Sequence, residues 1–104
     1  MLPVTILQAR EYSEWFAQLR DINARTRILA RIRRLALGNP GDAKAVGEGV
    51  RELRIDYGPG YRIYFARRGS TIVVLLCAGD KSRQSADIAS ALKLAHSWRA
   101  DDGP

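Results

Sequence analysis

The sequence predicts an α+β fold with the element order β-α-α-β-β-β-α. Two segments with helical spacing of apolar residues lie in the first part of the chain, three segments with strand character follow, and a last helical segment comes after them. The 104 residues are typical of one hydrophobic core, so we expect a single domain over residues 1–104.

One short strand and two helices are expected first. Residues 3–7 are rich in β-branched side chains, which favour a strand. Helices are expected over residues 9–20 and 24–37, with residues 21–23 capping the second, and this helical hairpin should cover one sheet face. Their apolar stripes are Tyr12, Trp15, Phe16 and Leu19 in the first helix and Ile28, Ile32 and Leu35 in the second.

Three strands joined by short turns are expected in the middle of the chain. Residues 42–49 are polar and contain glycine, which indicates a loop. Strands are expected over residues 50–57, 61–67 and 71–78, and they should be antiparallel because their connections are short. The last of them is apolar on both faces, which is typical of a central strand covered on both sides.

The turn at residues 58–60 predicts the register of the strands that flank it. With a three-residue loop, Ile55 faces Ile63 and Asp56 faces Arg62, and this pairing keeps the apolar face continuous. The Asp56–Arg62 pair would then lie on an open face, where loss of Arg62 should cost less than about 1 kcal/mol of stability.

A last helix is expected over residues 83–98, and residues 99–104 should fray. It could cover only part of the second sheet face, which carries Arg54, Arg62 and Tyr64. Its inner face is formed by Ile88, Ala91, Leu92 and Ala95.

The net charge of +6 and the isoelectric point of about 10.1 favour a polyanionic partner. Arginine supplies most of this charge, and its planar guanidinium grips phosphate with two hydrogen bonds. The one cysteine, Cys77, cannot form an internal disulfide, which suits a reducing compartment. Residues 1–8 do not resemble a signal peptide and the longest apolar run is too short to span a membrane, so we expect a cytoplasmic protein.

Several stretches of the sequence carry a resemblance to a known family. Residues 47–55 are Gly-Glu-Gly-Val-Arg-Glu-Leu-Arg-Ile, residues 58–65 are Gly-Pro-Gly-Tyr-Arg-Ile-Tyr-Phe, and residues 75–84 are Leu-Leu-Cys-Ala-Gly-Asp-Lys-Ser-Arg-Gln. With the element order, they resemble the RelE/ParE toxin superfamily, and within it the HigB-like addiction-module killer proteins. The sequence departs from that subgroup at Ala78 and Arg83, where the subgroup commonly has Gly and Thr.

The resemblance implies a toxin of a type II toxin–antitoxin system. It implies a ribosome-dependent endoribonuclease that cleaves mRNA with the RNA's own 2′-hydroxyl as nucleophile, neutralised by a helix-turn-helix antitoxin. Such enzymes carry a Tyr or His near the C-terminal end, whereas this sequence has no Tyr after Tyr64 and its one His is His96. Two alternatives therefore stay open: a ParE-like inhibitor of DNA gyrase that does no chemistry, and a toxin fold that only binds its antitoxin.

The candidate catalytic residues are Arg62, Lys81 and Tyr64. Cleavage builds negative charge on the phosphate, so a strand arginine and a lysine at a helix start are suited to stabilise it. Tyr64 could act as an acid or base, or stack on a nucleobase. Each residue also has a structural alternative: an ion pair with Asp56, a charge beside a helix cap, and a half-exposed strand aromatic, respectively.

The candidate RNA-binding residues are Arg54, Arg51, Arg83 and Gln84. Strand alternation places Arg54 on the face of Arg62 and Arg51 on the opposite face. Arg83 and Gln84 lie at the start of the last helix, where they could contact RNA or only lie in its first turn.

The second predicted helix carries a further basic face. It could contact ribosomal RNA or an acidic antitoxin segment, or could simply be solvated. The sequence has no zinc-ligand spacing, phosphate-loop motif or Ser/His/Asp set, so neither a metal nor a cofactor is expected. The arginines of this face are Arg25, Arg27, Arg31, Arg33 and Arg34.

Overall fold

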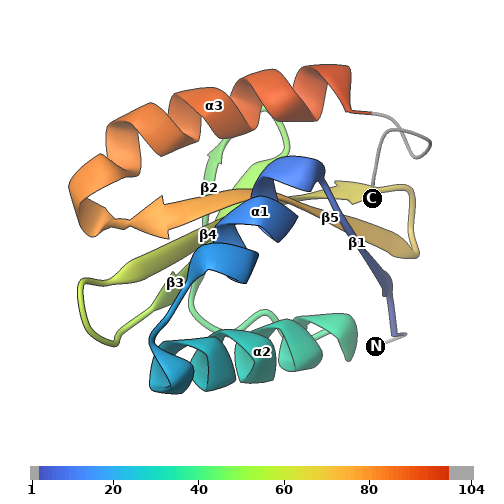
Figure 1. Ribbon diagram of the computed structural model, residues 1–104. Coiled ribbons are helices and arrows are strands. Elements are labelled where there is room, and N and C mark those ends of the chain that lie inside the picture. The colour runs from blue at the N-terminus through green and yellow to red at the C-terminus, as the bar shows by residue number, and fades with distance from the viewer. Residues whose placement is uncertain (1–2, 99–104) are drawn as a thin grey trace.

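A computed structural model describes residues 3–98, which form a five-stranded sheet with helices on both faces (Figure 1). The expected α+β class is confirmed. No helix in this range is long and apolar enough to cross a membrane. The fraying expected for residues 99–104 lies outside the described residues.

The elements are β1 (Thr5–Gln8), α1 (Arg10–Gln18), α2 (Ile22–Ala36), β2 (Ala43–Gly47), β3 (Val50–Ile55), β4 (Tyr61–Arg68), β5 (Ile72–Asp80), the short 3-10 helix η1 (Lys81–Arg83) and α3 (Gln84–Ser97).

The strands lie in the order β1-β5-β4-β3-β2. β1 is parallel to β5, and the other neighbours are antiparallel. β2 occupies residues for which the sequence predicts a loop, so that prediction is wrong. It is an edge strand held by backbone pairing with β3, and Lys44 and Ala45 within it are exposed. Apolar alternation, the signal that reveals half-buried strands, is therefore weak there.

Each face of the sheet buries its own apolar core. α2 and α3 lie on opposite sides of the sheet (Figure 1), and α1 packs with α2 in the first core. The predicted apolar stripes of all three helices are confirmed. The first core includes Tyr12, Ala24, Ile28, Leu35, Leu53, Ile55, Ile63, Phe65 and Leu75, and the second includes Val50, Tyr64, Ala66, Val74, Leu76, Cys77 and Ala91.

The register between β3 and β4 differs from the prediction by two residues. Arg54 pairs with Arg62 and Ile55 pairs with Tyr61, so the predicted Asp56–Arg62 pairing is wrong. The cause is a longer turn, because Tyr57 leaves the strand and its carbonyl accepts a hydrogen bond from the Gly60 N–H at 3.0 Å. A shift of two residues keeps each side chain on its predicted face, so the apolar face is still continuous.

A bulge in β5 makes the second face more apolar than simple alternation suggests. Tyr64 pairs with Cys77 and Phe65 with Leu75, so Leu76 is an extra residue in β5. Leu76 and Cys77 both enter the second core as a result. This packing, together with α3, covers Tyr64 completely.

Asp21 caps α2 and also anchors the β3–β4 turn. Its Oδ1 accepts a hydrogen bond from the Ala24 N–H at 3.1 Å, and its Oδ2 accepts one from the Tyr57 hydroxyl at 3.0 Å.

We expect Asp21→Ala to lower the free energy of unfolding by about 1–2 kcal/mol, measured by urea denaturation. The matched variant Glu14→Ala, at an exposed position of α1, should change it by less than about 0.5 kcal/mol. Equal stability of the two variants would contradict the capping role.

Candidate functional site

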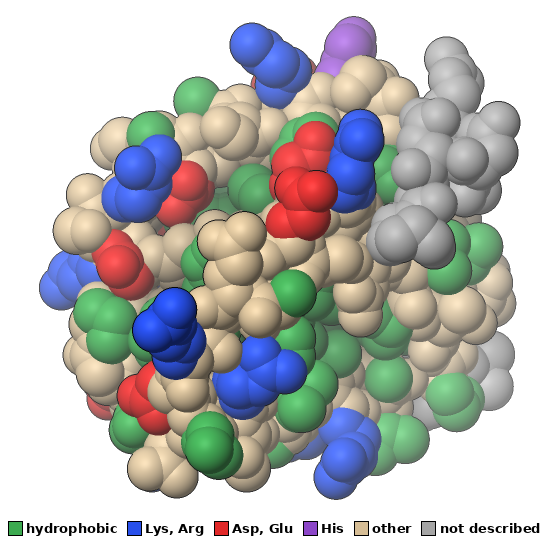
Figure 2. All heavy atoms as spheres, in the orientation of Figure 1, with side chains coloured by type: hydrophobic (Ala, Val, Ile, Leu, Met, Phe, Trp, Pro, Cys, Tyr) green, Lys and Arg blue, Asp and Glu red, His purple; other side chains and the backbone are tan. Residues whose placement is uncertain are grey.

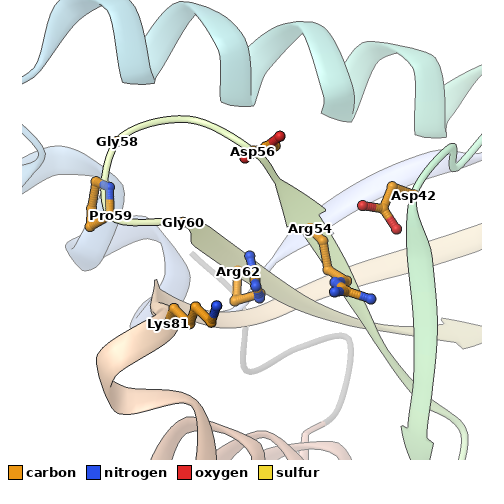
Figure 3. Close-up of a pocket in the computed structure, with 8 residues that line it drawn as sticks. All are labelled: Asp42, Arg54, Asp56, Gly58, Pro59, Gly60, Arg62 and Lys81. Carbon is orange, nitrogen blue, oxygen red and sulfur yellow. The ribbon is translucent and has the colours of Figure 1, made fainter.

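A hollow of about 400 Å³ opens beside the β3–β4 turn (Figure 3). Figure 3 shows the side chains of Arg54, Arg62 and Lys81 around the same space, with Lys81 extending toward Arg62. We call it the basic hollow, because three of its lining side chains are cationic and two are carboxylates. It is lined by Asp42, Arg54, Asp56, Gly58, Pro59, Gly60, Arg62 and Lys81.

Backbone pairing and a glycine bring the three cations together. Arg54 near the end of β3 pairs directly with Arg62 near the start of β4. Gly60 has a φ of 81°, a conformation that favours glycine. A Cβ at this position would lie 3.4 Å from the Lys81 Cβ and 3.6 Å from the Arg62 Nη1. These are ordinary contact distances, so glycine is needed here for its backbone conformation, and the turn that it forms lies against both Lys81 and Arg62.

Arg62 forms an ion pair with a buried carboxylate. Its side chain is 9% exposed and that of Glu52 is 1% exposed, and the Arg62 Nε lies 3.9 Å from the Glu52 Oε1. The Arg62 Nη1 also donates a hydrogen bond to the Tyr61 carbonyl at 3.2 Å. The predicted partner, Asp56, and the predicted open face are therefore both wrong. Because the pair is buried, Arg62 has a larger effect on stability than a surface ion pair would have.

Tyr64 and Gln84 complete the surroundings of Glu52. The Glu52 Oε2 accepts a hydrogen bond from the Tyr64 hydroxyl at 2.9 Å and one from the Gln84 Nε2 at 2.8 Å. Burial, and next the hydrogen bond to Glu52, raise the pKa of Tyr64. The ring is fully buried, so the stacking and half-exposed interpretations are both wrong. Tyr64 lies behind the basic hollow and does not line it.

Arg51 and Arg83 lie apart from the basic hollow. Arg51 donates a hydrogen bond to the Ala43 carbonyl at 3.4 Å and lines a smaller hollow with Phe65, on the face opposite Arg54 as predicted. The Arg83 side chain is 71% exposed, and its Nε lies 3.8 Å from the Asp87 Oδ1. Of the predicted RNA-binding residues, the structure therefore places Arg54 in the hollow.

Lys81 is exposed and begins η1 directly after β5. The helix cap considered as an alternative is present, since Asp80 accepts a hydrogen bond from the Ser82 N–H at 2.9 Å. A hydrogen bond from the Ser82 hydroxyl is the main cause that lowers the pKa of Asp80. This cap orients the chain at Lys81, and the lysine side chain reaches the hollow.

The face shown in Figure 2 carries charges of both signs and has no single basic patch. In the view of Figure 2, Lys and Arg side chains lie among Asp and Glu side chains and hydrophobic ones. Local convergence, as in the basic hollow, therefore says more about a binding site than the overall charge of +6.

Comparison with known proteins places the chain in a family. Residues 14–96 match the family described as "Phage derived protein Gp49-like (DUF891)", and this range contains every residue that lines the basic hollow. The chain belongs to this family. The Gp49-like proteins are toxins of the RelE and addiction-module killer type, so the resemblance to RelE-type toxins is confirmed at that level.

A relative of this Gp49-like chain occurs in Haemophilus influenzae (strain ATCC 51907 / DSM 11121 / KW20 / Rd). That relative carries the name "Uncharacterized protein" and is 44% identical over 94 residues. The similar region covers 90% of this chain and 95% of the relative. The two proteins are therefore similar over nearly their whole lengths.

Sequence reasoning missed Glu52, the residue on which the arrangement of Arg62 depends. Alternation places Glu52 on the same face of β3 as Arg54, next to a strand that carries Arg62 and Tyr64 on that face. A carboxylate opposite an arginine and a tyrosine on a face covered by a helix signals a buried polar cluster. The register error concealed this signal, because it assigned Arg62 to Asp56.

A second buried carboxylate of the Gp49-like chain was also missed. Asp87 on α3 is 9% exposed, and burial is the main cause that raises its pKa. Its Oδ2 would overlap with a Cβ added at Gly79 of β5. Glycine at this position therefore permits the close approach of α3. Cys77 beside it belongs to the second core, and burial raises the pKa of its thiol to about 12.

Proposed function

We propose that this Gp49-like chain is the toxin of a type II toxin–antitoxin pair and that it cleaves mRNA on the ribosome, in the cytoplasm. The observation that supports the proposal is the convergence of Arg54, Arg62 and Lys81 on one hollow, with Arg62 largely buried beside Glu52. Preorganised cations around developing charge are a main source of catalysis, and the ribosome would orient the RNA.

In the proposed reaction the 2′-oxygen of the RNA attacks the adjacent phosphorus and the bond to the 5′-oxygen breaks, which leaves a cyclic phosphate. Arg54 and Arg62 stabilise the charge on the phosphate. The exposed ammonium of Lys81 donates a proton to the leaving 5′-oxygen, and a carboxylate of the hollow, Asp42 or Asp56, accepts the proton of the 2′-hydroxyl. This scheme assigns Tyr64 a structural role, as a partner of Glu52.

We propose a helix-turn-helix antitoxin as the partner that silences this activity. The toxin-type family implies an antitoxin, and a chain of net charge +6 would attract an acidic partner segment. Attraction between opposite charges speeds association and weakens as salt is added.

The Arg54→Ala variant is expected to reduce mRNA cleavage by about tenfold, the lower end of what a charged hydrogen bond contributes. Arg51→Ala is the matched control, because it removes the same side chain from the same strand outside the hollow. Cleavage is measured by mapping new mRNA 5′ ends after induction in cells, and growth arrest is scored in parallel.

Both variants should keep their melting temperature within a few degrees, because neither side chain is fully buried. Equal cleavage by the two variants would remove Arg54 from the site. Inhibition of gyrase supercoiling by the purified protein, with no new mRNA ends in cells, would replace the proposed function by the ParE-like alternative.

A further inference from the structure

A second hollow of about 260 Å³ lies on the α2 side of the β3–β4 turn. Asp56 lines both this hollow and the basic hollow, so the two are neighbours that share one carboxylate. Figure 3 shows the Asp56 side chain on the side of the basic hollow that faces α2. We call the second one the α2 hollow, and it is lined by Arg27, Ala30, Arg31, Arg34, Ile55 and Asp56.

The guanidinium groups of Arg31 and Arg34 are crowded together at the edge of the α2 hollow. Their Nη2 atoms lie 3.3 and 3.5 Å from the single point that a Cβ would occupy at Gly41. Burial, and next the charge of Arg34, lower the pKa of Arg31. Like charges this close create a strong local positive potential, which attracts an anion.

Backbone carbonyls accept the hydrogen bonds of the Arg31 guanidinium. It donates hydrogen bonds to the carbonyls of Arg54 at 2.5 Å, Pro40 at 3.1 Å and Asp42 at 3.1 Å. Among the described residues, no carboxylate forms an ion pair within 4.0 Å of Arg31 or Arg34. Arg31 is thus committed to the fold, whereas Arg34 carries a charge that the described residues leave without a carboxylate partner.

Arg27 is positioned at the other end of the α2 hollow. Its guanidinium carbon lies 4.6 Å from the centre of the Tyr57 ring, and the Tyr57 hydroxyl is held by Asp21. A guanidinium fixed over an aromatic ring has lost much of its side-chain freedom before any ligand binds. Arg27 therefore offers an ordered fork for a phosphate group, and Arg34 offers a second, exposed guanidinium at the same hollow.

We propose that the α2 hollow binds the RNA phosphate next to the one held in the basic hollow. One RNA strand then crosses Asp56, and the Asp56 carboxylate accepts a hydrogen bond from the 2′-hydroxyl of a ribose. The inference rests on the proposed function and adds a substrate subsite to it. A carboxylate between two cationic hollows repels a strand of phosphates unless a donor faces it. RNA supplies such a donor between successive phosphates, and DNA does not.

The experiment measures binding of a fluorescein-labelled single-stranded RNA of about twelve nucleotides by fluorescence anisotropy over a range of salt concentrations. The Arg27→Ala/Arg34→Ala variant should bind about tenfold more weakly. Its slope of log K against log salt should fall by about 0.7 for each phosphate that the variant no longer neutralises. Arg33→Ala is the matched control, since Arg33 is an exposed arginine of α2 that does not line the hollow. Circular dichroism checks that each variant is folded.

The second arm tests the ribose contact with DNA and 2′-O-methyl RNA of the same sequence. The parent protein should prefer unmodified RNA to both. Asp56→Ala should lose most of this preference and bind DNA more tightly than the parent does, because a repulsive charge has gone. Glu14→Ala removes an exposed carboxylate on α1, which is far from Asp56 in the sequence, and should retain the preference for RNA.

Unchanged RNA affinity and salt slope in Arg27→Ala/Arg34→Ala would overturn the inference. If that variant instead stops co-purifying with the antitoxin, the occupant of the α2 hollow is an acidic protein segment and the RNA proposal is wrong. The proposed function is tested separately by Arg54→Ala, which alters only the basic hollow. If Arg54→Ala weakens RNA binding and Arg27→Ala/Arg34→Ala does not, the proposed function stands and the subsite is rejected.

Discussion

Arg62→Ala is expected to abolish growth arrest, with mRNA cleavage reduced at least about 100-fold, and to lower the free energy of unfolding by about 3 kcal/mol. The first effect follows from the place of Arg62 in the basic hollow, where its guanidinium would meet the charge of the reacting phosphate. The second follows from Glu52, which is 1% exposed and would lose its cation. Cleavage is measured by mapping mRNA 5′ ends, and stability by urea denaturation.

A double variant separates these two effects of Arg62. Arg62→Ala/Glu52→Gln removes the uncompensated charge, while the new amide oxygen can still accept hydrogen bonds from Tyr64 and Gln84. We expect it to recover most of the lost stability and none of the toxicity. Growth arrest by the stable double variant would show that Arg62 is structural, and the role in phosphate binding would then pass to Arg54 and Lys81.

Gly79→Ala is expected to destabilise the protein by about 3 kcal/mol, at the upper end of what overpacking a core costs. The added Cβ would overlap with the Oδ2 of Asp87 and lie 3.1 Å from its Cγ. Rotation of the carboxylate about the Cβ–Cγ bond would leave the contact with the Cγ unchanged, so the whole Asp87 side chain, which is 13% exposed, would have to move. The free energy of unfolding is measured by urea or thermal denaturation monitored by circular dichroism.

The second site of a double-mutant cycle tests this steric explanation. Asp87→Ala removes the atoms that the new Cβ would meet, so Gly79→Ala/Asp87→Ala should be clearly more stable than Gly79→Ala. Asp87→Ala alone should change stability little, for two reasons. The buried Oδ2 that it removes has no hydrogen-bond partner, and the ion pair that it removes involves the exposed Arg83. Additive losses in the double variant would show that the contact with Asp87 does not explain the requirement for glycine.

The α+β class and both apolar faces could be predicted because periodicity records which side of an element is buried. Ile28 and Leu35 on α2, and Leu53 and Ile63 on the sheet, all lie in the first core as expected. β2 could not be predicted, because an edge strand is held by backbone hydrogen bonds that any residue can make. Its exposed Lys44 leaves no periodic pattern.

The register of β3 and β4 was beyond local sequence reasoning for a different reason. Tyr57 leaves the strand, its hydroxyl bonds to Asp21, and Arg27 lies over its ring. These partners are far from the turn in sequence and come from the start of α2. A turn length inferred from Gly58 and its neighbours alone cannot include them.

By itself, the sequence determined the order of the elements other than β2, the faces that they bury, and the cationic candidates Arg54, Arg62 and Lys81, because spacing along a chain fixes which side chains share a face. Only the tertiary structure decided that these three share one hollow, that Glu52 forms an ion pair with Arg62, and that Tyr64 lies behind them. Those relations depend on register and on the packing of α3, which are set by contacts between distant segments.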